Sequence, residues 1–100
     1  MSAAATTLAL SGEMTVVNAA EHRLSLLTAA TQASAQSQGL ALDLVKVEAL
    51  DSAGVQLLIA TRKTLQAAGG HALRITNANS AVQDTLAIYS LQHWLTGESA

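Results

Sequence analysis

Apolar residues recur along the chain with two different spacings, which predict strands alternating with helices. Thr6–Leu10 is short, compatible with extended backbone and ends at Ser11-Gly12, so it predicts a first strand that runs into a turn. Glu13–Val17 predicts either a brief second strand or the lead-in to a helix, and we favour the strand.

The first long helix is predicted over Asn18 to about Ser37, because this stretch contains no Gly or Pro. Asn18 or Thr15 is expected to cap its N-terminus, and Gly39 is placed for a cap at its C-terminus. The residues that recur at helical spacing, and are expected to face the core, are Ala19, Leu24, Leu27, Ala30 and Ala33 or Ser34.

Leu40–Val47 carries the strongest strand pattern in the sequence. Every second residue from Leu40 to Leu44 is leucine. The intervening Ala41 and Val45 are apolar as well, which is the pattern of a central strand buried on both faces. Burial is therefore expected for a set of residues from this strand and from later elements: Leu42, Leu44, Val45, Leu58, Ile59, Leu65 and Ile75.

A second helix and a further strand follow a turn over Glu48–Gly54. Val55–Ala68 is predicted to be helical and to end at Gly69-Gly70. Ala72–Thr76 alternates well enough for a strand. The inward stripe of the helix is expected to consist of Val55, Leu58, Ile59, Leu65 and the aliphatic part of Arg62.

A third helix and a short strand complete the expected elements. Asn77–Ser80 is a predicted loop in which Asn79 or Ser80 caps a helix over Ala81–Ile88, and a short strand near His93–Leu95 could close the sheet. This order predicts an α/β domain with a mixed, mainly parallel sheet of four to five strands and helices packed against it. Residues 1–100 are expected to form a single domain with frayed ends at 1–5 and 97–100.

Composition narrows the classes of function. The chain has 100 residues, of which 50% are apolar, and no Cys, so it can bury a core without disulfides. Its 12% of charged residues and net charge of −2 argue against a nucleic-acid partner, which requires clustered Lys and Arg. No apolar run approaches the roughly 18 residues of a membrane span, and Met1–Thr7 lacks the regions of a signal peptide, so a cytoplasmic protein is expected.

The segment of greatest chemical interest is Asp51-Ser52-Ala53-Gly54, between the strongest strand and the second helix. Ser52 is suited to be the N-cap, because its hydroxyl can accept an N–H of the first turn, and Asp51 adds a favourable negative charge. The alternative is that Ser52 carries a phosphate, which a helix N-terminus would favour. Both interpretations share one geometry, and the second requires an exposed hydroxyl.

No set of residues completes an active site. Ser52 has no evident general base, and His22, His71 and His93 lie in three separate elements. The seven carboxylates show no paired metal-ligand spacing, and the glycine pair at 69–70 follows a helix instead of opening one. We therefore expect no catalytic residue, no metal and no cofactor, and a protein that is not an enzyme.

Four landmarks follow one another along the chain: Gly12-Glu13 after an apolar strand, Leu42-Asp43-Leu44 within a strand, Asp51-Ser52-Ala53-Gly54 opening a helix, and Gly69-Gly70 before the next strand. Together they resemble the STAS domain, the fold of bacterial anti-sigma factor antagonists, over about Leu8 to Leu95. Within the family, the Gly12-Glu13-Met14-Thr15 stretch and the Ala-rich first helix look closest to short stand-alone STAS proteins found with chemotaxis genes. The small STAS subunit of a lipid (Mla-type) ABC transporter is a near neighbour, with Thr at the Ser52 position.

The resemblance implies a non-enzymatic switch. In such proteins a partner serine kinase, which is also the anti-sigma factor, phosphorylates the first hydroxyl residue after the Asp, and a phosphatase restores binding. Carried over by position, Ser52 would be the phosphorylation site and Asp51 its acidic neighbour. The alternative is a subunit that clamps the ATPase of the lipid transporter, for which phosphorylation is irrelevant. The expected partner-binding residues are Asp51, Ser52, Ala53, Gly54, Gln56, Ala60 and Lys63.

Overall fold

The computed structural model describes residues 5–91, in which three strands form one parallel sheet. The strands are β1 (Ala5–Met14), β2 (Gly39–Leu50) and β3 (Leu73–Ala78), in the spatial order β1-β2-β3. The α/β class and the central place of β2 are confirmed. The described part has three strands, fewer than the four or five expected, and every pair in it is parallel. The strand predicted near His93–Leu95 lies outside the described residues, as does the frayed end expected at 97–100. Of the frayed end expected at 1–5, only Ala5 is described, and it is the first residue of β1.

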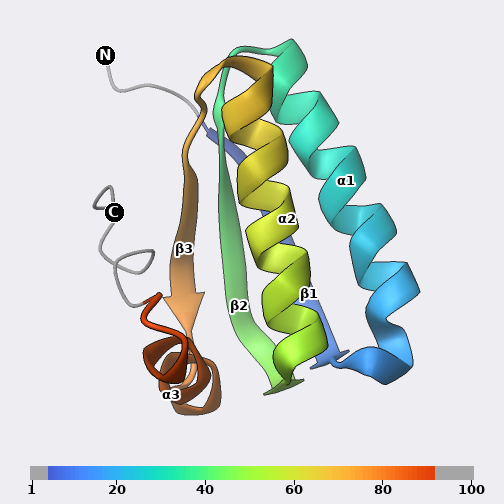
Figure 1. Cartoon of the computed structure of the whole chain (residues 1–100), viewed down its shortest axis with the longest axis vertical. Coiled ribbons are helices and arrows are strands. Elements are labelled where there is room, and N and C mark those ends of the chain that lie inside the picture. Colours follow the sequence, from blue (N-terminus) through green and yellow to red (C-terminus); the bar gives the residue numbers. More distant parts are fainter. Residues whose placement is uncertain (1–4, 92–100) are drawn as a thin grey trace.

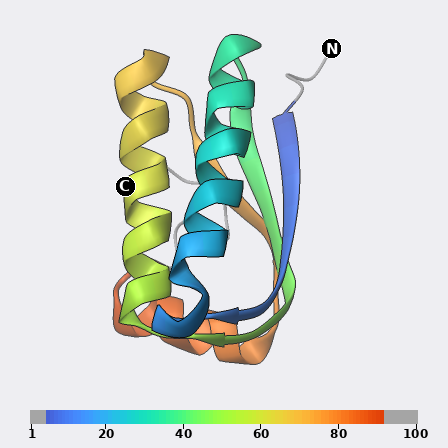
Figure 2. The same ribbon diagram turned by 90° about the vertical axis from the view of Figure 1, so that its right-hand side faces the viewer.

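Two long helices cover one face of the sheet. α1 (Ala19–Ala35) and α2 (Ser52–Gly69) lie side by side on it, and α3 (Ser80–Ile88) lies near the carboxyl ends of the strands (Figure 1, Figure 2). The short 3-10 helix η1 (Val16–Asn18) joins β1 to α1 at the same end. The carboxyl ends of β1 and β2 and the amino ends of α1 and α2 therefore meet at one end of the molecule.

β1 continues past the turn predicted at Gly12, so the separate strand expected over Glu13–Val17 is wrong. Gly12 has a φ of +76°, and the register with β2 shifts beside it, so the chain bends without leaving the sheet. The Thr15 hydroxyl then accepts a hydrogen bond from the Val17 N–H at 3.3 Å and caps η1. This cap turns Val16 and Val17 outward, and they are 73% and 77% exposed.

The core lies between the sheet and the two long helices. Leu42 and Leu44 of β2 and Leu58 of α2 are fully buried, as expected. Val45 is 49% exposed, so the expectation of burial was wrong for it. Ile59 was also expected to be buried and is only partly so. Leu44 and Val45 are consecutive strand residues that point to opposite faces of the sheet, and Leu44 belongs to the core. α1 and α2 both cover one face of the sheet (Figure 2), so Val45 on the other face is not covered by them.

A bulge interrupts β2 near Val45. β2 advances from Asp43 to Lys46 over a stretch in which β1 uses one residue fewer. Asp43 Oδ1 accepts the Val45 N–H at 3.1 Å, and Asn79 Nδ2 donates to the carbonyls of Val45 and Val47 at 3.0 and 2.6 Å. These side chains satisfy backbone groups in the bulge, and the extra residue returns Val47 to the core.

α1 is rotated relative to the expected orientation. Leu24 and Leu27, predicted to face the core, are 67% and 44% exposed. Apolar residues occur on both sides of this helix, so their spacing alone cannot determine which side is buried. The residues that do face the core are His22, Leu26, Ala29, Ala30 and Ala33.

The helix ends follow the sequence only in part. Gly70 ends α2 in the left-handed conformation, with φ +75°, and Asn79 caps α3 by accepting the Val82 N–H at 3.0 Å, as predicted. Gly39, in contrast, does not cap α1. It begins β2, where a Cβ would lie 2.8 Å from the Ala72 carbonyl oxygen.

Candidate functional site

Asp51, and not Ser52, is the N-cap of α2. Its Oδ1 accepts the Gly54 N–H at 3.1 Å, and its Oδ2 accepts the Val16 N–H at 3.1 Å. A carboxylate can do both because it has two acceptor oxygens, whereas a serine hydroxyl has one. These donors, with Gly54 contributing most, hold the pKa of Asp51 below its ordinary value. Asp51 therefore ties the start of α2 to the connection between β1 and α1.

Ser52 is the first residue of α2, and its side chain is exposed. Because Asp51 supplies the cap, the Ser52 hydroxyl takes no part in the hydrogen bonds that hold this turn. A substituent on that hydroxyl would thus break none of them. The first-turn N–H groups and the helix dipole would favour a negative charge there.

Gly54 lies inside the turn, where α2 presses against the end of β1. A Cβ at this position would collide with the Met14 carbonyl oxygen and lie 2.5 Å from Leu50 Cδ1. The Asp51 N–H donates to the same Met14 oxygen at 3.3 Å. Gly54 is therefore buried, and its lack of a side chain allows the start of α2 to lie against the end of β1.

The exposed residues that sequence reasoning missed are Val16 and Val17. They lie beside the Asp51 carboxylate, because the Val16 N–H is bound to it. The backbone around them is held by Asn18 Nδ2 and His22 Nε2, which both donate to the Glu13 carbonyl, at 3.2 and 3.0 Å. The signal that could have revealed them was Thr15, since a capping residue there ends the strand before the valines.

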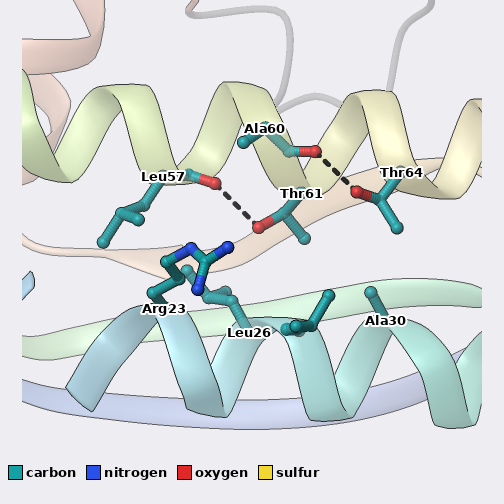
Figure 3. A pocket seen from close by; sticks show the side chains of 8 residues that line it. Arg23, Leu26, Ala30, Leu57, Ala60, Thr61 and Thr64 are labelled. Carbon is teal, nitrogen blue, oxygen red and sulfur yellow. Dashed lines mark hydrogen bonds between the residues drawn. The ribbon is translucent and has the colours of Figure 1, made fainter. Parts of the chain in front are cut away.

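The outer side of α2 extends this surface. Gln56, Ala60 and Lys63 are exposed on it, and Ala53 is half-buried. Ala60 lines a hollow of about 100 Å³ between α1 and α2 (Figure 3). The other side chains that line the hollow are Arg23, Leu26, Leu27, Ala30, Leu57, Thr61 and Thr64.

The hollow is mainly apolar. The hydroxyls of Thr61 and Thr64 donate to the carbonyls of Leu57 and Ala60 in their own helix, at 2.7 and 3.0 Å, so they are already engaged. Arg23 extends from α1 toward α2 and supplies the positive charge at its edge (Figure 3).

The sequence matches a known domain family over almost its whole length. The model of the STAS domain matches residues 2–99. The chain belongs to the STAS domain family. No curated protein matches this STAS domain at a significant level.

Two solved structures share the fold of this STAS domain. The anti-sigma factor antagonist SpoIIAA in its unphosphorylated form superposes with a TM-score of 0.68 at 21% identity, over 88% of this chain and 74% of that chain. A Thermotoga maritima protein with the provisional description of anti-sigma factor antagonist gives a TM-score of 0.70 at 18% identity, over 92% of this chain and 78% of that chain. The fold of this STAS domain is therefore that of the anti-sigma factor antagonists.

The STAS domain brings most of the predicted site residues to one surface. Asp51 and Ser52 open α2, and Gln56, Ala60 and Lys63 follow along its exposed side. Within residues 5–91, no three His, Asp or Glu side chains come close enough to hold a metal ion. In the same part of the chain, no helix is both long and apolar enough to cross a bilayer.

Proposed function

We propose that this STAS domain is a non-enzymatic regulatory protein that binds a serine kinase of the anti-sigma factor class and is released when Ser52 is phosphorylated. The observation that carries the proposal is that two neighbouring residues have different roles at the start of α2. Asp51 accepts the hydrogen bonds that hold the turn, and the neighbouring Ser52 side chain is exposed and takes no part in them. Phosphorylation can then alter binding without altering the fold.

The docking surface in this proposal consists of Val16, Val17, Ser52, Gln56 and Ala60. The two valines offer apolar area, and α2 adds a side with few charges next to the hollow at Ala60. Phosphate on Ser52 would bring roughly −1.5 to −2 charges into the middle of this surface. Burying such a charge against a partner without a matching cation is costly, so the complex would dissociate.

The test begins with the kinase reaction, followed by intact-mass measurement and mapping of the phosphate. We expect one phosphate, on Ser52, and none on the Ser52→Ala variant. Ser80 is a built-in comparison, because it also occupies the first position of a helix after a side-chain cap. A phosphate on Ser80, Thr61 or Thr64 with Ser52 unmodified would contradict the mechanism.

The second measurement is the affinity of the unphosphorylated STAS domain and its Ser52 variants for the kinase. Ser52→Ala should bind constitutively, and Ser52→Asp should bind less tightly with an unchanged melting temperature. Asp carries one charge and fewer acceptor oxygens than phosphate, so a partial loss counts as support. Equal binding by Ser52→Ala and Ser52→Asp would contradict release by phosphorylation. The other candidate role, in which the domain clamps the ATPase of a lipid transporter, predicts that neither variant binds the kinase.

The extent of the docking surface can be mapped with charge substitutions. Gln56→Glu and Ala60→Glu should weaken kinase binding and leave the melting temperature nearly unchanged, because both positions are exposed. Ala87→Glu on α3 is the matched control, since it adds the same charge at an exposed position on another helix. If the two α2 variants bind as tightly as the control, the partner docks elsewhere.

A further inference from the structure

The outward side of α1 has a composition that is unusual for a helix facing water. No charged residue occurs from Leu24 to Ala35, although this stretch makes up most of the helix. Leu24 is 67% exposed and Leu27 is 44% exposed. A helix that covers a core normally has charged residues on the opposite side, as α2 does at Lys63.

Five of the exposed residues of α1 form a continuous stripe, which we call the outer stripe: Leu24, Leu27, Thr28, Thr31 and Ala35. Their spacing of three, four, seven and eleven residues places them on one side of a helix. The buried Leu26, Ala30 and Ala33 lie on the opposite side. The outer stripe is therefore a second, uncovered face of α1.

The outer stripe has two unlike halves. Its amino-terminal half carries the two leucines, and its carboxyl-terminal half carries small side chains. A shallow hollow runs from Leu27 over that second half, and Thr28, Thr31, Gln32 and Ala35 complete its lining. A surface with protruding side chains in one half and a hollow in the other is complementary to itself when a copy is turned end to end.

We propose that a second copy of this chain covers the outer stripe, through antiparallel pairing of two α1 helices about a two-fold axis. With the axis near residues 29–30, Leu24 of each copy lies over the small Ala35 of the other, and Leu27 lies over Thr31. Each copy then contributes both the leucines and the hollow that receives them. Large side chains packed against small ones allow close contact between two helices.

Charge favours the antiparallel arrangement over the parallel one. The charged residues of α1 are Glu21 and Arg23, both in its first turns. Antiparallel pairing about residues 29–30 separates the two copies of Glu21 by about 26 Å along the helix axis, well beyond the Debye length of about 8 Å at physiological salt. A parallel pair would bring them together.

The area of the contact between the two α1 helices determines how tightly the dimer is expected to associate. α1 has 17 residues, so the contact is about 26 Å long and about 10 Å wide. This is smaller than the roughly 800 Å² per partner of a standard interface, so the dimer is weak and depends on concentration.

Sedimentation velocity of the full chain from about 10 µM to about 1 mM tests self-association. We expect a monomer–dimer equilibrium that Leu24→Glu weakens at least about tenfold, because it places a charge in an apolar contact. Ile88→Glu is the matched control, since Ile88 is 78% exposed on α3. A wild type that is monomeric at about 1 mM, or a Leu24→Glu variant that dimerises like the control, would overturn the proposal.

Cross-linking tests the orientation of the pair. The chain has no Cys, so a single introduced thiol can react only with its copy. The antiparallel axis places Thr31→Cys thiols about 5 Å apart along the helix and Ala35→Cys thiols about 17 Å apart. Oxidation should therefore link Thr31→Cys chains efficiently and Ala35→Cys chains poorly. Equally efficient linking of both would indicate parallel helices and refute the arrangement.

Discussion

Leu44 provides the sharpest test of how the sheet and helices share one core. It lies in the middle of β2, pairs in register with Ala78 of β3 and is completely buried among the core residues. Leu44→Ala removes three carbon atoms from a site between the sheet and the helices. The surrounding side chains are mostly aliphatic and already packed, so the cavity can collapse only in part. We expect a loss of about 2–5 kcal/mol in the free energy of unfolding.

That loss is a large share of the total, because domains of this size are stabilised by only about 5–15 kcal/mol. It should also lower the melting temperature by at least about 8 °C. Urea titration of wild type and variant measures the difference. Val45→Ala is a close control, since Val45 is the next residue but is 49% exposed, and it should cost less than about 1 kcal/mol. If Leu44→Ala costs no more than Val45→Ala, β2 is not the central strand and the packing argument fails.

Two further predictions concern the start of α2. Gly54→Ala should destabilise the protein by about 1–3 kcal/mol in urea titration, because the new Cβ collides with the Met14 carbonyl; stabilisation, which helix propensity alone predicts, would contradict the close approach. The pKa of Asp51 is held below 3.8, the ordinary value, so its charge stabilises the fold above that pH and this contribution is lost as the pH falls through the lower pKa of the folded state. Asp51→Asn should therefore have a lower melting temperature than wild type at neutral pH and nearly the same melting temperature in strong acid. If the variant melts below wild type by the same amount at both pH values, the charge of Asp51 does not contribute to stability.

The C-terminus of α2 and the N-terminus of α3 were predictable, because each carries a residue type that is strongly preferred at that position. Gly70 takes a left-handed conformation after α2, and Asn79 caps α3 through its side chain. Leucine at every second position of β2 likewise predicted a central strand, although its apolar neighbour Val45 is 49% exposed. In these segments local preference and tertiary packing agree.

The connection from β1 into α1 could not be predicted in the same way. Gly12 allows either a turn or a bent strand, and only pairing with β2 decides between them. In α1 both sides carry apolar residues, so the side that meets the sheet is set by packing against α2 and β1. The bulge at Val45 likewise depends on Asn79, which is far away in the sequence. Long-range contacts determine each of these features, and a single sequence does not show them.

The sequence predicted where the candidate site lies but not which residue caps the helix there. The order of Asp51 and Ser52 before a helix located the site, but the usual preference for serine as a cap assigned the wrong residue. The carboxylate wins because it also binds the Val16 N–H from another segment, which a hydroxyl in the same position could not do at once. This contact exists only when β1 and α2 are folded together.

The two proposed surfaces meet at the hollow that Leu27 and Ala60 both line, but Leu24 and Val17 belong to one surface each and can be mutated separately. The outer stripe is centred near residues 29–30, about 16 Å along α1 from its first residue, Ala19, which follows the two valines of the docking surface. An antiparallel dimer would thus leave the part of each docking surface around Val17 open at its two ends. We expect Leu24→Glu to remove self-association and leave the affinity for the kinase per chain unchanged, and Val17→Glu to do the opposite. Titration calorimetry and sedimentation of the same two variants measure both quantities. If Leu24→Glu weakens kinase binding as much as Val17→Glu does, the outer stripe is part of the docking surface, and self-association through α1 would compete with the partner.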